Sequence, residues 1–293
     1  MTSGPSNRSS QVRLLLAQAV HRLADAEVDS PENDARLLLA HVLGVPPPQL
    51  SLVNEIDDRQ RRAFEELVGQ RAERVPLQHL TGRAYFRYLE LEVGPGVFVP
   101  RPETEVMTGW AIERLEKLIA DGRSPLVVEL CAGSGAIAKS IATEVPGVLV
   151  HAVELSEEAA HYASANLWGS AVTLHVEDMT HALTELNGLV DLVIANPPYV
   201  PLDAYLSIPV EARDHDPTVA LFSGDDGMDA IRVLVQVAAR LLRPGGVLAF
   251  EHADVQGNSA PAVVAASKAF ATIRDHTDYN ARPRFTTAVR GSS

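Results

Sequence analysis

Four consecutive residues in the C-terminal half of the chain could hold a flat amino group. Asn196-Pro197-Pro198-Tyr199 directly follows the mostly apolar run 191–195, which has the composition of a buried strand. The Asn196 side-chain oxygen and the Pro197 backbone carbonyl can accept both hydrogens of a planar NH2 group, and Tyr199 can stack on its face. The lone pair of such a nitrogen is delocalised, so two fixed acceptors would position it for attack and favour the positive charge that develops on it. The motif predicts a planar NH2 acceptor, and glutamine, adenine, cytosine and guanine all remain open.

A second pattern predicts a ligand-binding turn. The apolar run Val127–Leu130 leads into Cys131-Ala132-Gly133-Ser134-Gly135, and a helix is expected from Ala136. Glycines allow a tight bend and let a ligand approach the backbone with no Cβ in the way. The spacing Gly133-x-Gly135-x-x-Ala138 also fits the dinucleotide-binding fingerprint, so the turn alone does not identify the ligand. We find no base for the Cys131 thiol and interpret it as a packing residue.

Three acidic residues near the predicted strand ends distinguish the possible ligands. Glu129 stands just before the glycine turn, where a carboxylate can orient a cationic group. Glu154 ends the next strand and can accept hydrogen bonds from both hydroxyls of a ribose. Asp178 follows the third strand, where it can accept from an adenine amino group while Met179 packs on the ring. Because this arrangement suits a cationic ligand without phosphates, it favours S-adenosylmethionine over a nicotinamide dinucleotide.

Apolar periodicity beyond Arg101 predicts an alternation of strands and helices, which implies a mostly parallel, doubly wound α/β sheet. The last two strands have only a turn between them and should pair antiparallel, which is the expected shape of a class I methyltransferase with a Rossmann-like sheet. The expected strands are Leu126–Leu130, Leu149–Val153, Val172–Val176, Val190–Ala195, Val247–Glu251, Thr272–Thr277 and Arg284–Val289, with helices at Ala136–Val145, Glu157–Asn166 and Met228–Leu242.

The N-terminal part of the chain reads as a small helical bundle. Helices are expected over 11–26, from the Ser30-Pro31 start signal to Gly44, and over 57–74. Ser30 is expected to cap its helix with its hydroxyl, and residues 1–10 are expected to form a disordered tail. We therefore predict a helical domain over residues 1–75, a connecting β-hairpin around Gly94-Pro95-Gly96 within 76–100, and a methyltransferase domain over 101–293.

Composition narrows the function classes. The formal net charge of −13 argues against unaided, nonspecific binding to nucleic acid, which depends on neutralising phosphates. No apolar run approaches the roughly 20 residues that a bilayer-spanning helix needs. The N-terminus has no signal-peptide or transit-peptide pattern, so a cytoplasmic location is expected. The single cysteine, Cys131, leaves no intrachain disulfide, and the histidines lack metal-ligand spacing, so no metal is assigned.

Several longer motifs resemble those of the HemK-type release-factor glutamine methyltransferases, and the resemblance covers nearly all of the chain. The helical start and the joining segment carry the more specific matches, and the acceptor motif is shared with many nitrogen methyltransferases. The matching runs are Asp34–Gly44, Pro76–Gly82, Phe98–Glu105, Asn196–Tyr199, Glu211 with Asp216-Pro217, Gly224–Met228, Gly245-Gly246, Glu251-His252 and Gln256-Gly257.

This resemblance implies a substrate, a partner and a set of site residues. The acceptor would be the glutamine of the Gly-Gly-Gln tip of class 1 release factors, and the N-terminal bundle would contribute to docking them. The protein would act as a monomer. Asn196, Pro197 and Tyr199 would be catalytic, and Pro198 would help to hold the glutamine. Arg101 and Glu103 would either line the acceptor pocket or serve the structure alone. By position, the cofactor would contact Cys131, Ala132, Gly133, Ser134, Gly135, Glu154, Met179 and Asn196.

Departures from the family pattern concern the cofactor more than the reaction. Glu129 and Glu154 stand where many relatives have Asp, Met179 where an aromatic residue is common, and Ala253 where a glycine is usual. Two other functions remain as alternatives. A DNA adenine or RNA guanine methyltransferase would require a basic groove and a means of capturing a base, and a non-catalytic binding module would keep the fold without turnover.

Overall fold

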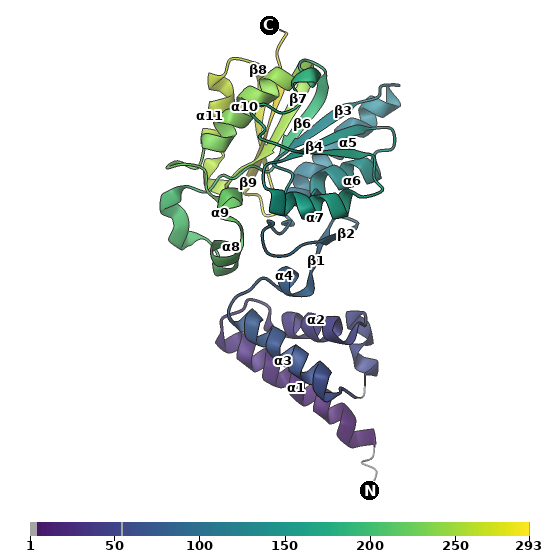
Figure 1. The fold of residues 1–293 in the computed structure, drawn as a ribbon. Helices are drawn as coiled ribbons and strands as arrows, with labels where there is room; N and C mark the ends of the chain where they lie inside the picture. The colour runs from purple at the N-terminus through teal and green to yellow at the C-terminus, as the bar shows by residue number, and fades with distance from the viewer. Residues whose placement is uncertain (1–4, 54, 293) are drawn as a thin grey trace. The chain divides into compact units, whose positions relative to one another are not determined.

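The chain folds into two compact units. A computed structural model describes residues 5–53 and 55–292, and residues 1–4, 54 and 293 lie outside this description. The first unit comprises Met1–Arg83 together with Pro209–His215, and the second comprises Ala84–Ile208 together with Asp216–Ser293. Figure 1 labels most of the helices and strands of both units along the colour gradient. The helical unit therefore includes a segment from far along the sequence, and the predicted boundaries at residues 75 and 100 do not match this division.

The helical unit packs its helices around a small apolar core. Leu23 of the first helix, Leu38 and Leu39 of the second and Phe64 of the third are all almost fully buried. Gly44 ends the second helix in the left-handed conformation at φ 63°, as its position after the last apolar residue predicted. The elements are α1 (Pro5–Asp25), α2 (Pro31–Leu43), η1 (Pro47–Leu52), α3 (Asp58–Ala72), α4 (Leu77–Thr81) and α8 (Val210–His215).

Two predictions for the helical unit are wrong. Residues 5–10 extend α1 instead of forming a disordered tail, because adding turns to an existing helix costs far less than starting one; residues 1–4 lie outside the described part of the chain. Ser30 stands at the start of α2, but its side chain makes no capping hydrogen bond. The full capping arrangement occurs at α3, where the Asp57 side chain accepts from the Gln60 amide and the Gln60 side chain accepts from the Asp57 amide.

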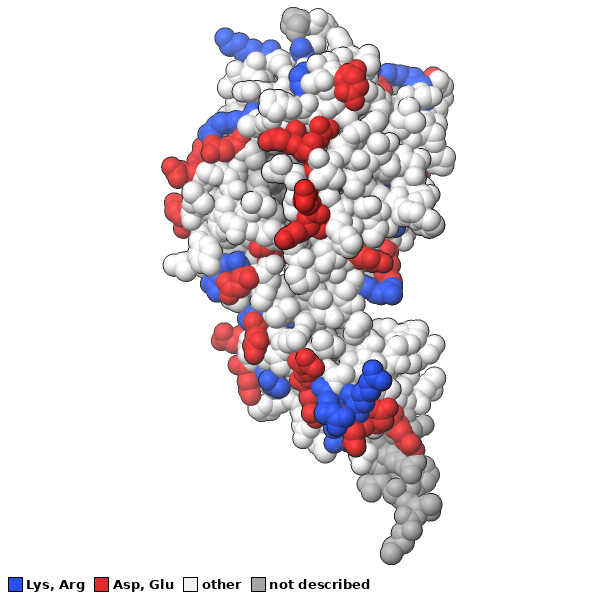
Figure 2. Space-filling model, viewed as in Figure 1, with Lys and Arg blue, Asp and Glu red and all other residues white. Residues whose placement is uncertain are grey.

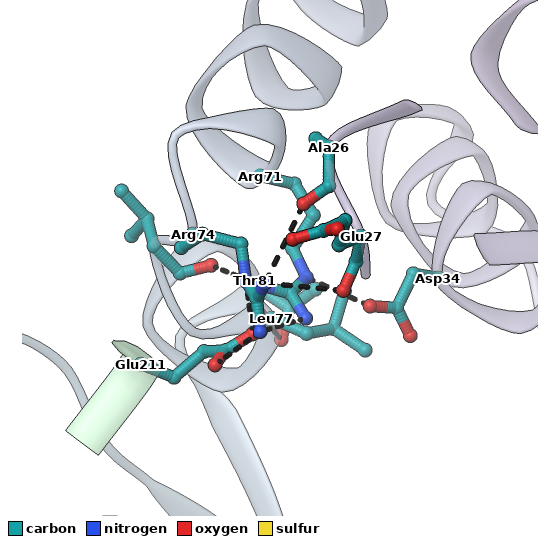
Figure 3. Close-up of polar contacts among 9 residues, drawn as sticks. Ala26, Glu27, Asp34, Arg71, Arg74, Leu77, Thr81 and Glu211 are labelled. Carbon is teal, nitrogen blue, oxygen red and sulfur yellow. Dashed lines mark hydrogen bonds and ion pairs between the residues drawn. The ribbon is translucent and has the colours of Figure 1, made fainter. Parts of the chain in front are cut away.

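An ion cluster joins α8 to α2 and α3 within the helical unit (Figure 3). Nε of Arg71 donates to Asp34 at 2.7 Å, and its Nη1 and Nη2 both donate to Glu211 Oε1 at 3.1 Å. Arg74 donates through Nε and Nη2 to the two oxygens of Glu211, at 2.7 and 2.8 Å. Its Nη1 also donates to the Glu27 carbonyl. Two guanidinium groups therefore converge on a single carboxylate, which anchors residues 209–215 to the helices.

The connecting segment forms its hairpin at a different turn from the predicted one. β1 (Arg83–Phe86) and β2 (Leu89–Glu92) make a separate two-stranded sheet, and residues 87 and 88 connect them. Arg87 adopts a left-handed φ of 51°, and its Nε and Nη2 donate to the Glu144 carboxylate at 2.6 and 2.7 Å. This pairing with a residue distant in the sequence stabilises a turn that lacks glycine.

The predicted strands around Gly94-Pro95-Gly96 are therefore wrong. Residues 94–96 follow β2 as part of a loop, and Val97–Val99 are in no strand. Val93, Val97 and Val99 bury their side chains against Ala159 of the second unit. Their apolar character reflects burial in a loop and not strand formation.

A seven-stranded sheet forms the centre of the second unit, in the order β5-β4-β3-β6-β7-β9-β8. β5, β4, β3, β6 and β7 pair in parallel, whereas β9 pairs antiparallel with β7, and β8 antiparallel with β9. The predicted mixed sheet with a terminal antiparallel hairpin is confirmed. The strands are β3 (Leu126–Leu130), β4 (Leu149–Glu154), β5 (Val172–Val176), β6 (Val190–Ala195), β7 (Leu242–Glu251), β8 (Phe270–Thr277) and β9 (Pro283–Arg290).

Helices cover both faces of this sheet (Figure 1). Alternate strand residues point to opposite faces, so Val127 belongs to the core under α5, α6 and α7, and Val128 to the core under α10 and α11. The helices are α5 (Thr104–Ala120), α6 (Ala136–Glu144), α7 (Glu157–Leu167), η2 (Thr184–Leu186), η3 (Leu202–Ser207), α9 (Thr218–Leu221), α10 (Asp229–Leu241), η4 (Asp254–Gln256) and α11 (Ser259–Ala266).

Among the helices that the structure describes, none combines the length and apolar character needed to cross a bilayer.

Candidate active site

The two motifs singled out by sequence lie at the ends of neighbouring strands. Leu130 of β3 is the parallel partner of Ala195 of β6, so the glycine turn and Asn196 begin at the same level of the sheet. Ala195 also pairs with Phe250 of β7, which brings Glu251 to the other side of Asn196. Ligands bind at the carboxyl ends of strands in open parallel sheets. The register therefore places a ligand turn, an acceptor motif and a buried acid together.

The glycine turn has the conformation that its sequence predicted. Gly133 and Gly135 have φ of 55° and 78°, a region that side chains strain. A Cβ at Gly133 would meet no atom within 4 Å, whereas a Cβ at Gly135 would press against Leu167 at 3.0 Å. The Asn166 side chain donates to the Ser134 carbonyl at 2.9 Å and holds the turn from α7. Gly133 therefore faces open space, and Gly135 allows close helix packing.

Glu154 binds the backbone of this turn, and Glu129 binds the backbone of the helix that follows it. The Glu154 carboxylate accepts from the amides of Gly133 and Ser156, at 2.7 and 2.8 Å, through different oxygens. Each oxygen keeps a lone pair, so the group can still accept from ribose hydroxyls. Glu129 accepts from the Ala138 amide at 2.8 Å, at the start of α6, and its burial raises its pKa well above the usual range.

Asp178 and Met179 follow β5 as predicted. The Asp178 carboxylate is exposed and accepts from the Thr180 amide and hydroxyl, which lowers its pKa and keeps it ionised. Met179 is partly buried and packs against the core under α10. Cys131 has a left-handed φ of 57°, and desolvation raises the pKa of its thiol, with further contributions from the nearby carboxylates. The thiol is thus uncharged, which agrees with a packing role.

The acceptor motif is held by a hydrogen-bond network from three elements. Asn196 Nδ2 donates to the Thr104 hydroxyl at 3.3 Å, and this hydroxyl donates to Glu251 Oε2 at 2.7 Å. The Tyr199 hydroxyl donates to Glu251 Oε1 at 3.0 Å. Gln256 donates to the Tyr199 carbonyl at 2.9 Å. In the described part of the chain, Asn196 Oδ1 and the Pro197 carbonyl oxygen accept no hydrogen bond, so both acceptors are available.

Burial controls the charge of this network. Desolvation raises the pKa of Glu251, and the charge of Glu103 adds to the increase, whereas hydrogen bonds from Thr104 and Tyr199 oppose it. The pKa of the Tyr199 hydroxyl is raised well above its usual range, first by burial and then by the Glu251 charge. Tyr199 therefore stays protonated, and its hydroxyl fixes the ring instead of acting as a base.

Arg101 and Glu103 have structural partners of their own. Nη2 of Arg101 donates to Asp216 at 2.7 Å, and its guanidinium lies 5.0 Å from the centre of the Phe98 ring. Glu103 precedes α5 and is close enough for its charge to act on Glu251. Contact of either side chain with the substrate stays a prediction. Pro198 is partly exposed and lies between the buried Pro197 and the partly buried Tyr199.

Sequence reasoning assigned no role to Thr104, Glu251, Asn166 or Gln256. Thr104, Glu251 and Gln256 stand in motifs shared with a known family, and this resemblance is the one signal in the sequence that points to them. Each lies far along the chain from the acceptor motif, and only the sheet register and the packing of α5 bring them together. Of the described residues, no group of three or more His, Cys, Asp or Glu is arranged to hold a metal ion.

The residues around the turn fit an adenosylmethionine molecule. Open space lies over Gly133, where a ligand would need it; Glu154 ends β4, and Asp178 follows β5. A cationic ligand without phosphates agrees with carboxylates in positions where a nucleotide phosphate would be repelled. The longer acid at position 154 still accepts from the amides of Gly133 and Ser156, so the departure from Asp preserves the turn.

Two family models match the chain. The model described as the PrmC N-terminal domain matches residues 15–82, and the methyltransferase small domain matches residues 91–205. Together they cover most of the helical unit, strands β3 to β6 of the sheet and the acceptor motif.

Several known proteins are similar to this chain over most of its length. A release factor glutamine methyltransferase of Streptomyces coelicolor is 53% identical over 273 residues, covering 93% of this chain and 96% of that protein. A 4-amino-L-phenylalanine/4-methylamino-L-phenylalanine methyltransferase of Streptomyces pristinaespiralis is 42% identical, with 86% of each covered. The structure of the T. thermophilus 16S rRNA N2 G1207 methyltransferase with AdoMet and guanosine matches 71% of this chain and 49% of its own at a TM-score of 0.50 and 22% identity, which supports the fold. With this identity over almost its full length, the chain belongs to the release factor glutamine methyltransferase family.

Proposed function

We propose that this protein transfers a methyl group from S-adenosylmethionine to the side-chain amide nitrogen of the glutamine in the Gly-Gly-Gln motif of class 1 release factors. The observation that carries the proposal is the pairing of Leu130 with Ala195, which sets two available acceptor oxygens beside the glycine turn. Membership of the family supplies the identity of the substrate.

The chain's own residues provide the binding and orientation. Asn196 Oδ1 and the Pro197 carbonyl accept the two hydrogens of the glutamine NH2 group, which fixes the plane of the amide. Tyr199, fixed by its bond to Glu251, offers the ring face on which that plane stacks. These contacts strengthen as positive charge develops on the nitrogen, so they stabilise the transition state more than the bound substrate. The bound cofactor supplies an electrophilic methyl group.

No general base is required before attack. A methylated amide cation is strongly acidic and loses its proton readily after the methyl group is transferred. Tyr199 stays protonated because of its raised pKa, and Glu251 accepts from two hydroxyls in a buried position. Their roles are therefore to orient the acceptor site. Proton loss to water after transfer agrees with this assignment.

Charge distribution favours a protein substrate over a nucleic acid. Figure 2 shows acidic side chains in the middle of the face of the methyltransferase unit that it presents, and no continuous basic groove crosses that face. The net charge of −13 points the same way. A monomer acting in the cytoplasm, where release factors work, agrees with this substrate.

A panel of acceptors tests the proposal. The protein is incubated with radiolabelled S-adenosylmethionine and, separately, with a class 1 release factor, duplex DNA, ribosomal RNA and 4-amino-L-phenylalanine. The last acceptor is included because one relative bears that substrate in its name. We expect label on the release factor, lost when its Gly-Gly-Gln glutamine is replaced by alanine. Label on nucleic acid or the amino acid alone would reject the proposal, and no transfer would favour a binding module.

A further inference from the structure

We propose that Thr104 and Glu251 are positioning residues that orient the Asn196 side-chain amide, so that its oxygen and not its nitrogen points toward the substrate. The proposal rests on the proposed function, because it concerns the same acceptor site. An asparagine amide can turn by 180° about its last bond and exchange oxygen for nitrogen with almost no change in shape. Only one of the two orientations offers an acceptor to a substrate NH2 group; the other offers a competing donor.

The directions of the hydrogen bonds among Glu251, Thr104 and Asn196 fix the orientation of the Asn196 amide. A carboxylate can only accept, and both oxygens of Glu251 are occupied by hydroxyl donors, Thr104 at 2.7 Å and Tyr199 at 3.0 Å. The Thr104 hydroxyl has one hydrogen, and that hydrogen points at Glu251. Its oxygen can therefore only accept from Asn196, which must turn Nδ2 toward α5 at 3.3 Å. Oδ1 is left to face the acceptor site.

The burial of Thr104 and Glu251 strengthens their hold on the orientation of the Asn196 amide. Thr104 is 4% exposed and Glu251 is 1% exposed, so water does not compete for either group. If Asn196 turned over, its Oδ1 would face a hydroxyl oxygen with no hydrogen to offer, and the hydrogen bond between the partly buried amide and the buried Thr104 hydroxyl would be lost. The carboxylate thus polarises a chain of two hydrogen bonds that ends on the catalytic amide. Thr104 and Glu251 need not touch the substrate to act.

Three variants on one helix separate orientation from packing. Thr104→Val keeps the shape and removes the hydroxyl, and Thr104→Ser keeps the hydroxyl. Thr108→Val is the matched control, because the Thr108 hydroxyl is equally buried on α5 but donates to the Thr104 backbone carbonyl instead of joining the network. We expect Thr104→Val to lower kcat at least about tenfold, as loss of a transition-state contact does, with KM for S-adenosylmethionine little changed. Thr104→Ser and Thr108→Val should keep kcat near that of the unaltered protein.

Equal kcat in Thr104→Val and Thr108→Val, measured on protein confirmed as folded by its thermal unfolding, would overturn the proposal. An equal loss in Thr104→Ser would also overturn it, because the hydroxyl would then not be the determinant.

A second measurement does not depend on turnover. The side-chain NH2 resonances of Asn196, assigned by their loss in Asn196→Ala, report its hydrogen bond directly by nuclear magnetic resonance. We expect one of the two protons to exchange slowly with solvent in the unaltered protein and in Thr108→Val, and both to exchange fast in Thr104→Val. Fast exchange of both protons in the unaltered protein would reject the orientation. An ordered amide in a protein that methylates no acceptor would instead reject the proposed function alone.

Discussion

At the scale of single residues, the site depends on atoms that keep unused bonding capacity. Glu154 binds two backbone amides and still has lone pairs for a ligand, and Asn196 donates through Nδ2 while Oδ1 stays available. Buried polar groups are normally satisfied, so such spare acceptors stand out where the chain meets a ligand. The Tyr199 hydroxyl donates to Glu251, and Thr104 donates to the other carboxylate oxygen, so the hydrogen bonds of these side chains are directed to one another. Tyr199 and Glu251 therefore hold the acceptor site in place.

Replacing Asn196 with alanine tests the main catalytic assignment. The variant loses one of the two acceptors but leaves the glycine turn intact. We expect turnover to fall on the order of a hundredfold, as it does on loss of one preorganised contact, while the affinity for S-adenosylmethionine is largely kept. Single-turnover methylation of a release factor and calorimetric cofactor titration measure the two effects. Turnover like that of the unaltered protein would refute the role of Asn196.

Tyr199→Phe should change the pH dependence of the reaction. The ring is kept, but Glu251 loses a hydroxyl donor that favours its ionised form. Burial already raises the pKa of Glu251, and the charge of Glu103 adds to this, while Thr104, Tyr199 and the Arg284 charge oppose it; without the Tyr199 hydroxyl the pKa of Glu251 should rise further. A protonated Glu251 could donate to Thr104 and turn the Asn196 amide over. We therefore expect kcat to fall on the acid side at a higher pH in the variant.

The profile of kcat against pH, recorded for both proteins at saturating substrate, measures this shift. Tyr162→Phe is the control, since its hydroxyl donates to the Pro95 carbonyl and not to Glu251. An acid limb at the same pH in Tyr199→Phe and Tyr162→Phe would contradict the link between Glu251 and the reaction.

The sequence predicted the parts of the site that are local motifs. Asn196–Tyr199 and the glycine turn are each contiguous, and their chemistry follows from neighbouring residues. Thr104 and Glu251 are 147 positions apart in the sequence and are joined by a hydrogen bond, and the residues around each give no local signal of its role. A buried threonine hydroxyl and a carboxylate at a strand end become a network only through the register of β6 with β7 and the packing of α5.

At the scale of elements, glycine has different roles in two left-handed turns. Gly133, before α6, and Gly44, after α2, have φ of 55° and 63°, and a Cβ at either would meet no protein atom within 4 Å. Alanine at either position should cost about 1 kcal/mol of stability, because the left-handed conformation disfavours a side chain. Only at Gly133 would the added methyl group occupy the space proposed for the cofactor.

Gly133→Ala should therefore weaken S-adenosylmethionine binding by about tenfold or more, because overpacking a contact costs about 1–3 kcal/mol. Gly44→Ala should lose similar stability and bind the cofactor normally. Calorimetric titration and thermal unfolding of the two variants make the comparison. Equal cofactor affinity in both would argue that the ligand does not approach the turn at Gly133.

Element boundaries were predictable where an apolar run is closed by turn residues. β3, β5 and β6 begin and end at the predicted positions. The hairpin was misplaced because Gly94-Pro95-Gly96 is a stronger local turn signal than Arg87-Tyr88. Arg87 overcomes this through its bonds to Glu144, a tertiary contact that no local pattern announces. At Ser30 a local signal is present but the predicted contact is not, since this favourable capping residue makes no capping hydrogen bond.

At the scale of the whole molecule, the chain leaves the methyltransferase unit after η3 and returns to the helical unit. Residues 209–215 pack there, although 125 positions separate them from Arg83, the previous residue of that unit before Ala84–Ile208. Glu211 binds both Arg71 and Arg74, and its side chain is 18% exposed. The pairing lowers the pKa of Glu211 from 4.5 to about 2, despite the opposing effect of its partial burial.

This shift predicts a loss of stability in acid. Since the folded-state pKa is depressed, the ionised Glu211 stabilises the fold above its unfolded pKa, and this contribution is lost as the pH falls from about 5 toward about 2. The full shift corresponds to about 3 kcal/mol, and screening at the partly exposed Arg74 reduces our expectation to about 2 kcal/mol.

Glu211→Gln should thus be less stable at neutral pH and should lose less further stability in acid than the unaltered protein. Urea unfolding at several pH values, with hydrogen exchange of the α2 and α3 amides to locate the effect, measures both differences. Asp214→Asn is the matched control, because Asp214 lies on the same helix but pairs with Arg213 beside it at an exposed position, where an ion pair contributes little. If both variants lost stability in parallel with the unaltered protein as the pH fell, the ion cluster of Arg71, Arg74 and Glu211 would not be what holds residues 209–215 in the helical unit.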